Sequence, residues 1–400
     1  MRYALLAFLL APAFLSGADW PQFNGPNGDC ASSETGINKD WMRNRPKELW
    51  RIALGDHGFG GPSAAGGKLF IVDYKDGEDI LRAIDVNIGK DAWSLHYPNP
   101  GPEQEYGFTR STPLYSDGKV YALSRHGLLV CADVEKGEKL WSRDLVADFQ
   151  GRKPAYFYAH SPVVDGEHLI VCPCGPGANV VCLDKKTGNE IWRGGGDEPG
   201  GYCTPIVAKL GGKKQYVVFT GVSVIGIDPT NGAQVWSHPW RTQYNLNIAT
   251  PAVSGDTVFV SSDYGKGCAL LNLAGGKPAL VWENKLMQTH FNTPVLFEGS
   301  FIGNSGNATK SGDLVGLDAK TGNAVFDQQG FEAGGLLSVE GCLIVLNGHS
   351  GDVSLVKVEK GLRDLGRIRP LSGQSWTAPI LADGRLFVRN RDALVCINVK

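Results

Sequence analysis

Short apolar runs recur along the chain, and six of them end at copies of one phrase. The phrase is an Asp, a Gly four residues later and an aromatic residue four residues after the Gly. The copies are Asp85-Gly89-Trp93, Asp133-Gly137-Trp141, Asp184-Gly188-Trp192, Asp228-Gly232-Trp236, Asp318-Gly322-Phe326 and a looser Asn272-Gly276-Trp282. Their aromatic residues follow one another at 44 to 51 residues, a period that indicates a propeller or another repeat array.

Each phrase predicts a β-hairpin. The Asp side chain can accept backbone N–H bonds in the turn, and the Gly supplies the positive φ that the turn needs. The aromatic residue then lies on the returning strand, where a large ring packs well on a pleated surface. A single hairpin is only marginally stable, so we expect neighbouring copies to bury each other's faces.

The units around these hairpins share one order. Each opens with a small residue and Pro, as at Thr112-Pro113, and continues into an apolar strand, a turn and a second strand. A third strand ends at the Asp, and the strand with the aromatic residue is the fourth. Pro suits the start of a strand because its missing N–H costs little there. Four short strands in each unit are typical of a propeller blade.

The two ends of the chain predict how the ring closes. The unit at 334–370 is degenerate, and the last unit stops at Lys400 after three strands. The strand at 48–54 carries Trp50 in phase with the repeat and can supply the missing fourth strand, which removes open sheet edges. We therefore predict an all-β fold, an eight-bladed β-propeller of four-stranded antiparallel blades over residues 48–400. Its last blade is closed by the N-terminal strand.

The first 18 residues have the pattern of a secretory signal peptide. Arg2 precedes an apolar run from Tyr3 to Leu15, and Ser16-Gly17-Ala18 supplies small residues before a cleavage site. Ala18 stands where a bacterial lipoprotein signal needs Cys, so no lipid or other membrane anchor is expected. Residues 19–47 then form an irregular extension before the propeller. We expect a soluble, monomeric bacterial protein that is periplasmic or secreted.

Charge and cysteine content narrow the function classes. A formal net charge of −2 gives no sign of electrostatic binding to nucleic acid or to anionic lipid.

Of the nine cysteines, Cys131, Cys182 and Cys396 occupy one equivalent position in three units. We expect them to be buried and reduced, because free Cys packs as a small hydrophobe. The pairing state of the others stays open: Cys30, Cys172, Cys174, Cys203, Cys268 and Cys342.

The phrase resembles the repeat of PQQ-like β-propellers, most clearly in residues 183–192 (LDKKTGNEIW). That superfamily includes pyrroloquinoline-quinone alcohol dehydrogenases and the outer-membrane assembly lipoprotein BamB. The resemblance covers about residues 48–400. It implies that the tryptophans of the phrase dock between neighbouring blades, here Trp93, Trp141, Trp192, Trp236 and Trp282.

The resemblance does not extend to a quinone site. Dehydrogenases of this kind place an adjacent Cys-Cys disulfide over the cofactor and use a calcium site and an Asp base. The chain has no Cys-Cys pair, and Cys172-Pro173-Cys174 is not a match. The acidic segment from Asp73 to Asp79 does not follow the EF-hand pattern and is expected to be a solvated loop. We predict no catalytic residue, metal ligand or cofactor, with PQQ and Ca²⁺ as the alternative.

Candidate binding residues cluster in the loops that lead into the first strand of each unit. In a propeller these lead-in loops share one face, at the mouth of the central channel. Aromatic walls with a few polar groups suit a ligand or peptide site, although the same residues could simply pack the loops together. The predicted binding surface, which we call the funnel face, is centred on Arg110, Tyr158, His160, Tyr202, His290 and Trp376.

Two functions follow from these patterns. The first is an exported, non-catalytic binding or scaffold propeller that recognises a protein, peptide or small ligand at the funnel face. Arginine and large aromatic residues dominate interface hot spots, and no nucleophile–base pair can be assembled from the motifs. The alternative is a PQQ-dependent quinoprotein oxidoreductase of alcohols or sugars with a non-standard site.

Overall fold

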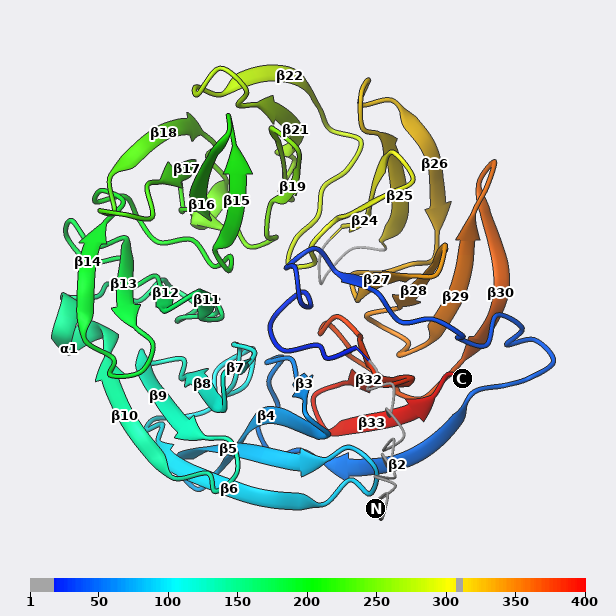
Figure 1. Cartoon of the computed structure of the whole chain (residues 1–400). Helices are drawn as coiled ribbons and strands as arrows, with labels where there is room; N and C mark the ends of the chain where they lie inside the picture. The colour runs from blue at the N-terminus through cyan, green and yellow to red at the C-terminus, as the bar shows by residue number, and fades with distance from the viewer. Residues whose placement is uncertain (1–17, 307–311) are drawn as a thin grey trace, which may run out of the picture.

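The computed structural model describes residues 18–306 and 312–400. Almost all of the predicted signal peptide lies outside the described residues, so its cleavage stays a prediction. Eight sheets stand around a central axis, and the chain passes through them in order (Figure 1). In each blade the first strand lies nearest the axis and the fourth forms the outer rim. The predicted eight-bladed propeller is confirmed.

Strand pairing within each blade is antiparallel, as predicted. Blades 1 to 4 consist of β3 (Ser63–Ala65), β4 (Lys68–Lys75), β5 (Glu78–Asp85) and β6 (Asp91–Pro98); β7 (Leu114–Ser116), β8 (Lys119–Leu123), β9 (Leu128–Asp133) and β10 (Lys139–Asp144); β11 (Val163–Asp165), β12 (His168–Val171), β13 (Val180–Asp184) and β14 (Glu190–Gly194); β15 (Ile206–Leu210), β16 (Lys213–Phe219), β17 (Ser223–Ile227) and β18 (Gln234–Pro239). Blades 5 to 8 consist of β19 (Ala252–Ser254), β20 (Thr257–Ser262), β21 (Gly267–Asn272) and β22 (Ala279–Asn284); β23 (Val295–Phe297), β24 (Ser300–Ser305), β25 (Asp313–Asp318) and β26 (Ala324–Gln329); β27 (Gly335–Val339), β28 (Cys342–Leu346), β29 (Val353–Val358) and β30 (Leu362–Ile368); β31 (Ile380–Ala382), β32 (Arg385–Arg389), β33 (Ala393–Asn398) and β2 (Lys47–Ala53).

Helices are short in this fold. The α-helix α1 (Leu145–Phe149) follows β10, and the 3₁₀ turn η1 (Gln243–Asn245) precedes blade 5. Within the described residues, no helix has the length and apolarity that a membrane span requires.

The ring closes where the two ends of the chain meet. β2 pairs antiparallel with β33, Trp50 lies opposite Cys396, and the blade has the order β2-β33-β32-β31. This arrangement confirms the predicted closure by an N-terminal strand. The degenerate unit also completes its blade, because β30 supplies a fourth strand without the phrase.

Tryptophan and glycine from adjacent blades make the outer seams of the ring. At five seams, a Cβ added to the glycine of one blade would lie 2.5–2.7 Å from the indole of the preceding blade. These pairs are Trp50–Gly89, Trp93–Gly137, Trp141–Gly188, Trp192–Gly232 and Trp282–Gly322. Each glycine also has a φ of 67–74°, so the position requires Gly for space and for backbone conformation. Four indoles donate Nε1–H to a carbonyl of the next blade at 2.8–3.2 Å, namely Trp50, Trp93, Trp192 and Trp282.

Trp236 does not follow the predicted docking. Its Nε1–H donates to Gln215 Oε1 of the same blade at 2.5 Å, and its ring lies against Gly226. No atom of the described residues lies within 4 Å of a Cβ added at Gly276 in the next blade. The two residues inserted between Gly276 and Trp282 give that turn a different shape, so the indole folds onto its own sheet instead.

Other parts of the phrase agree with prediction. Asp184 Oδ1 accepts the backbone N–H groups of Lys186 and Thr187 at 2.9 and 2.8 Å.

Cys131, Cys182 and Cys396 are buried at equivalent strand positions, and all nine cysteines are free thiols in the structure. Burial raises the pKa of each of these three thiols to about 12. They therefore serve as small core residues.

The leader, residues 19–46, crosses the middle of the ring (Figure 1). Trp20 exchanges two backbone hydrogen bonds of 2.8 Å with Ala64 in blade 1. Asn24 Nδ2 donates to Thr293 Oγ1, just before blade 6, at 2.9 Å. The leader then adds β1 (Ala31–Ser32) as a parallel strand beside β27 in blade 7. The Pro21 carbonyl also accepts the Tyr115 backbone N–H of blade 2 at 2.8 Å, across the ring from blade 6, so the leader gives the central channel a floor.

Candidate functional site

The lead-in loops enclose a cavity of about 200 Å³ at the centre of the ring. The leader forms its floor, and the loops of seven blades, with Tyr264 from a second loop of blade 5, form its wall. The lining residues are Trp20, Phe23, Asn24 and Cys30 of the leader, then Phe59, Gly61, Pro62, Tyr106, Arg110, Thr112, Tyr156, Ala159, Tyr202, Thr204, Leu246, Ile248, Thr250, Tyr264, His290, Phe291, Asn292, Thr293, Trp376, Thr377, Ala378, Pro379 and Ile380. We call this cavity the funnel.

A second cavity, of about 720 Å³, lies on the other side of the leader. It is lined by residues 27–29 of the leader and by turns at Gly212 and Gly255, at the far ends of the first strands. Because the leader lies between the two cavities, the funnel is a dead-end pocket and not part of an open channel.

Aromatic rings in mutual contact form most of the funnel wall. Phe59 stacks on Trp376 with 4.7 Å between the ring centroids, and Phe291 packs on the same indole at 5.0 Å. Tyr106 lies 6.1 Å from Trp376 and 5.6 Å from Tyr156, in an edge-to-face arrangement with Tyr156. Such a wall offers large, rigid apolar faces to a guest.

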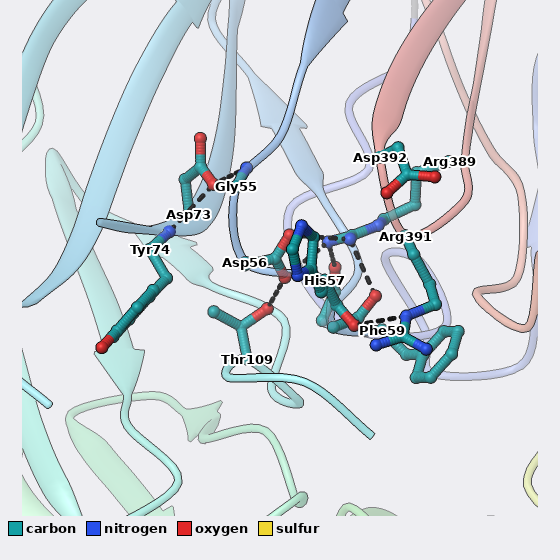
Figure 2. A network of polar contacts seen from close by, with 12 residues as sticks. Gly55, Asp56, His57, Phe59, Asp73, Tyr74, Thr109, Arg389, Arg391 and Asp392 are labelled. Carbon is teal, nitrogen blue, oxygen red and sulfur yellow. Dashed lines mark hydrogen bonds and ion pairs between the residues drawn. The ribbon is translucent and has the colours of Figure 1, made fainter. Parts of the chain in front are cut away.

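A buried ion pair holds the loop that carries Phe59. Asp56 Oδ1 and Arg389 Nη2 are 2.9 Å apart, and both side chains are fully buried. Thr109 donates a further hydrogen bond to the same carboxylate (Figure 2). Arg389 also donates to two carbonyl groups of the loop, at 2.8 and 2.9 Å. Since Asp56 follows β2 and Arg389 ends β32, the pair joins the closing blade to the first lead-in loop.

A second buried network supports the loop that carries Tyr106. Asn99 Nδ2 donates to Asp79 Oδ1 at 2.6 Å, and Arg125 Nε donates to Asn99 Oδ1 at 3.0 Å. Burial raises the pKa of Asp79 to about 7, against the opposing effects of Asn99 and Arg125. The acidic segment from Asp73 to Asp79 therefore ends in a buried scaffold residue. The expectation of a solvated loop was wrong here because Asn99 and Arg125 enclose its last carboxylate.

Arg110 brings a positive charge to the funnel wall. Its guanidinium donates to the carbonyls of Tyr106 and Gly107, each at a long 3.4 Å. Its Cζ lies 5.8 Å from the ring centroid of Tyr106 and 5.7 Å from that of Phe157. Burial, with a smaller effect of the nearby Arg125, lowers the pKa of Arg110 to about 10. The side chain therefore stays charged at neutral pH, and no carboxylate of the described residues pairs with it.

Several buried polar atoms of the lining have no hydrogen-bond partner among the described residues. They are Trp20 Nε1, Arg110 Nε, Thr250 Oγ1, both ring nitrogens of His290, Asn292 Oδ1 and Trp376 Nε1. A buried polar group that neither protein nor water pairs costs about 1–3 kcal/mol. Native proteins leave few such groups, and a concentration of them calls for an explanation. Here they surround one cavity, so a guest with complementary groups would recover part of this cost.

Three aromatic residues of the loops around the funnel have left-handed backbone, and one of them, Tyr264, lines the funnel. Phe157, Tyr244 and Tyr264 have φ values of 66°, 61° and 61°. This conformation costs roughly 1 kcal/mol or more for a residue other than Gly, and such strain clusters at ligand-binding segments. Tyr244 and Tyr264 are also 67% and 40% exposed, so their rings are available at the surface.

The structure separates the six sequence-predicted site residues into two groups. Arg110, Tyr202, His290 and Trp376 line the funnel together, and their binding role stays a prediction. Tyr158 and His160 lie in the core and do not line it.

Tyr158 and His160 have structural hydrogen bonds that explain their position. Tyr158 Oη donates to the Pro173 carbonyl at 2.8 Å. His160 Nε2 accepts the Cys172 backbone N–H at 3.0 Å, and burial lowers the pKa of this histidine to about 3. Their assignment to the funnel face is therefore corrected, because both side chains turn away from the channel to satisfy backbone groups of blade 3.

The sequence-predicted set omitted Trp20 of the floor. Its only local signal is the Trp20-Pro21-Gln22-Phe23 cluster in an otherwise polar leader. Phe59, Phe291 and Asn292 are also absent from that set, although they stand in the lead-in loops that pointed to the funnel face. Position within these loops was thus a better guide than residue type alone.

The described lining holds aromatic rings, small apolar residues and a few polar groups. No Asp or Glu is among the described residues that line the funnel, and no cluster of His, Cys, Asp or Glu in the described chain has the geometry of a metal site. Burial lowers the pKa of His290 to about 4, with Asp263 opposing the shift, so its imidazole is neutral at pH 7. A quinone site with calcium and a carboxylate base therefore does not fit these residues.

Comparison with protein families identifies the repeat. A family model described as "Outer membrane protein assembly factor BamB" matches residues 99–328, which is more than half of the chain. The chain belongs to this family of PQQ-like β-propellers. The family match agrees with the eight-bladed ring and with the tryptophan seams.

Individual relatives come from two branches of such propellers. BamB of Moranella endobia is 22% identical over 306 residues, 72% of each protein. Quinoprotein ethanol dehydrogenase of Pseudomonas aeruginosa is 26% identical over 180 residues, which is 41% of this chain but only 28% of that enzyme. Among solved structures, BamB from Moraxella catarrhalis aligns with a TM-score of 0.64 at 15% identity, covering 89% of this chain and 98% of that one. A europium-containing methanol dehydrogenase aligns with 0.68 at 12% identity over 93% and 89% of the two chains. These structural likenesses show the fold.

Proposed function

We propose that this propeller is a non-catalytic binding protein that takes up a segment of a partner protein or peptide in the funnel. The observation that carries this proposal is the set of unpaired buried polar atoms and the unneutralised Arg110 within an aromatic wall. A wall built only to pack the loops would be more stable with those atoms paired or replaced by apolar groups. Tyr264, which lines the funnel and is 40% exposed, extends the same surface outward.

The family match supports a protein partner. The matching family and the Moranella relative are described as outer membrane assembly factors, and assembly factors act on other proteins. The signal-like pattern of residues 1–18 adds export to the proposal, with cleavage between Ala18 and Asp19. N-terminal sequencing of the mature protein checks that part, and a protein that still begins at Met1 would contradict it.

A quinone-dependent oxidoreductase is the second candidate, because 180 residues resemble quinoprotein ethanol dehydrogenase. The absence of a carboxylate among the described lining residues speaks against it. Mixing the purified protein with PQQ and Ca²⁺, and assaying dye-linked alcohol oxidation, distinguishes the two. Turnover would favour the enzyme, and absence of turnover together with partner binding would favour the binding protein.

Site-specific photocrosslinking tests the binding function directly. A photoreactive amino acid replaces Tyr264 at the mouth of the funnel, and a matched control replaces Val235 on the outer rim. The two residues are 40% and 45% exposed, so accessibility is comparable. We expect a discrete protein adduct in cells from position 264 and none from position 235. No adduct at 264, or equal adducts at both positions, would contradict the proposal.

A further inference from the structure

Arg110 has the features of a receptor for an anion. Its charge lies in a cavity wall, its Nε is buried without a partner among the described residues, and its other contacts are two carbonyl bonds of 3.4 Å. Arg110 as a whole is partly buried, and charges removed from water are normally paired in proteins. No carboxylate of the described residues pairs with it, although two buried networks hold the neighbouring loops.

The charged groups around Arg110 do not supply that counterion. Arg125 is the other cation nearby, and its side chain is already engaged by Asn99 in the Asp79 network. Glu103 pairs with Arg391 at 2.9 Å and with His57 at 3.2 Å. Glu198 accepts hydrogen bonds from Thr220 and Ser223. These two carboxylates therefore have other partners. Asp263 is buried beside the funnel and acts on His290, and its Oδ2 has no partner among the described residues. No carboxylate is among the groups that shift the pKa of Arg110.

The remaining unpaired groups define what would stand beside the anion. Trp20 Nε1 and Trp376 Nε1 are donors without acceptors among the described residues, and like Arg110 they line the funnel. The rings of Phe59, Phe291 and Tyr106 lie against Trp376 in the same wall. Donors and one cation favour oxygen acceptors on the guest, and the ring faces favour a planar apolar group next to them.

We infer that the funnel binds a carboxylate that is adjacent to an aromatic ring, with the carboxylate at Arg110 and the ring against the Phe59–Trp376–Phe291 wall. The inference rests on the proposed function, which it makes more specific. Within a protein partner, a carboxylate next to an aromatic ring occurs at a C-terminal aromatic residue, and we propose such a residue as the guest. An acidic side chain next to an aromatic residue and a free aromatic acid share the chemistry and are distinguished by the test below.

The test compares N-acetyl-L-tryptophan with N-acetyl-L-tryptophanamide in calorimetric titrations of the mature chain. The two probes share the ring and the acetyl group and differ only in the carboxylate. We expect the acid to bind about tenfold more tightly than the amide, as one charge-assisted hydrogen bond would provide. Equal binding of both probes, or no binding of either at millimolar concentration, would overturn the inference.

Arg110→Gln should remove this preference while Arg152→Gln retains it. Arg152 is a half-exposed cation of the neighbouring lead-in loop that is paired with Asp197, and it does not line the funnel. A preference for the acid that survives Arg110→Gln would contradict the assignment. Because the comparison of acid and amide on the parent protein needs no variant, the test stands even where a variant folds poorly.

Peptides then identify the source of the carboxylate. A pentapeptide ending in a free Trp is compared with the same peptide amidated, and with an amidated peptide that contains an internal Asp-Trp pair. Tighter binding of the peptide with the free C-terminus supports a C-terminal residue as the guest, whereas tighter binding of the Asp-Trp peptide overturns this assignment. If crosslinking at the mouth succeeds but no probe shows a carboxylate preference, the proposed function stands and this inference fails.

Discussion

The tryptophans of the outer seams and the tryptophans of the funnel use the same side chain in opposite ways. Trp93 lies against Gly137 of the next blade and donates its Nε1–H to the Val134 carbonyl at 2.8 Å. Trp376 stacks between other rings, and its Nε1 is buried without a partner among the described residues. The Trp93 seam pairs its indole N–H, whereas the funnel leaves several polar groups without a partner among the described residues.

The same contrast holds for arginine. Arg389, which joins the closing blade to the first lead-in loop, is fully buried against the Asp56 carboxylate. Arg110 in the funnel has carbonyl contacts of 3.4 Å and no carboxylate partner among the described residues. The seams and the Asp56–Arg389 pair thus supply stability, and the lining of the funnel forgoes some of it. Such local loss of stability is typical of sites that bind something else.

The largest expected effect comes from removing the carboxylate partner of Arg389, which leaves this arginine unpaired like Arg110. Replacing Asp56 by Ala leaves a fully enclosed guanidinium without its carboxylate, and we expect a loss of about 3–5 kcal/mol in the free energy of unfolding. Urea unfolding measures the change. As the control, Glu103→Ala breaks the exposed pair with Arg391 and should cost at most about 1 kcal/mol. If the free energy of unfolding of Asp56→Ala lay within about 1 kcal/mol of the parent's, the ion pair would not be a main stabilising contact of the closing blade.

Glycine at a seam should matter more than glycine at a turn without a docked indole. A methyl group at Gly137 would lie 2.5 Å from the Trp93 ring, whereas Gly276 has a similar φ and open space around it. We expect Gly137→Ala to cost about 2–4 kcal/mol and Gly276→Ala about 1 kcal/mol. Thermal or urea unfolding of both variants measures the difference. Equal losses would mean that only backbone conformation selects glycine here.

The buried histidine of blade 3 should make the ring sensitive to acid. The folded-state pKa of His160 is about 3, below the ordinary value of about 6.5, so the unfolded chain takes up its proton first. The stability from this neutral histidine is complete above pH 6.5 and is lost as the pH falls toward 3. Between pH 6.5 and 5 the loss should be about 2 kcal/mol. A His160→Gln protein, which cannot titrate there, should show a flatter pH–stability curve; an unchanged slope would refute the assignment.

A smaller effect separates two seam tryptophans. Trp93 donates to a backbone carbonyl at 2.8 Å, whereas Trp141 Nε1 has no partner among the described residues. Phe at either position removes a similar volume, so the difference between the two variants isolates the hydrogen bond. We expect Trp93→Phe to cost about 1 kcal/mol more than Trp141→Phe in urea unfolding. The reverse order would show that indole hydrogen bonds do not strengthen these seams.

Most of the ring could be predicted because its parts are local and repeated. The Asp-Gly-Trp spacing predicts a turn and the strand after it, and the number of repeated units predicts the number of blades. Trp236 departed from the pattern because the turn that should receive it carries two extra residues. The space requirement at Gly137 and its equivalents was also missed, since the partner indole comes from the preceding blade.

The funnel could be predicted only in part. Position in the lead-in loops identified Arg110 and Trp376, but spacing does not say toward which side a ring turns. Tyr158 and His160 turned inward because backbone groups at Pro173 and Cys172 needed partners. Trp20 was missed because its bonding partner, Ala64, is 44 residues away and no repeat relates the two.

We conclude that the funnel forgoes stability in order to bind. The substitution Arg110→Met tests this claim, with urea unfolding and titration of N-acetyl-L-tryptophan on the same preparation. The claim predicts that the free energy of unfolding is unchanged or higher by up to about 1 kcal/mol, because an unpaired charge has been removed. It also predicts that the affinity for the acid falls about tenfold. A loss of 2 kcal/mol or more in stability, with the affinity retained, would show that Arg110 holds the loops together and would contradict the claim.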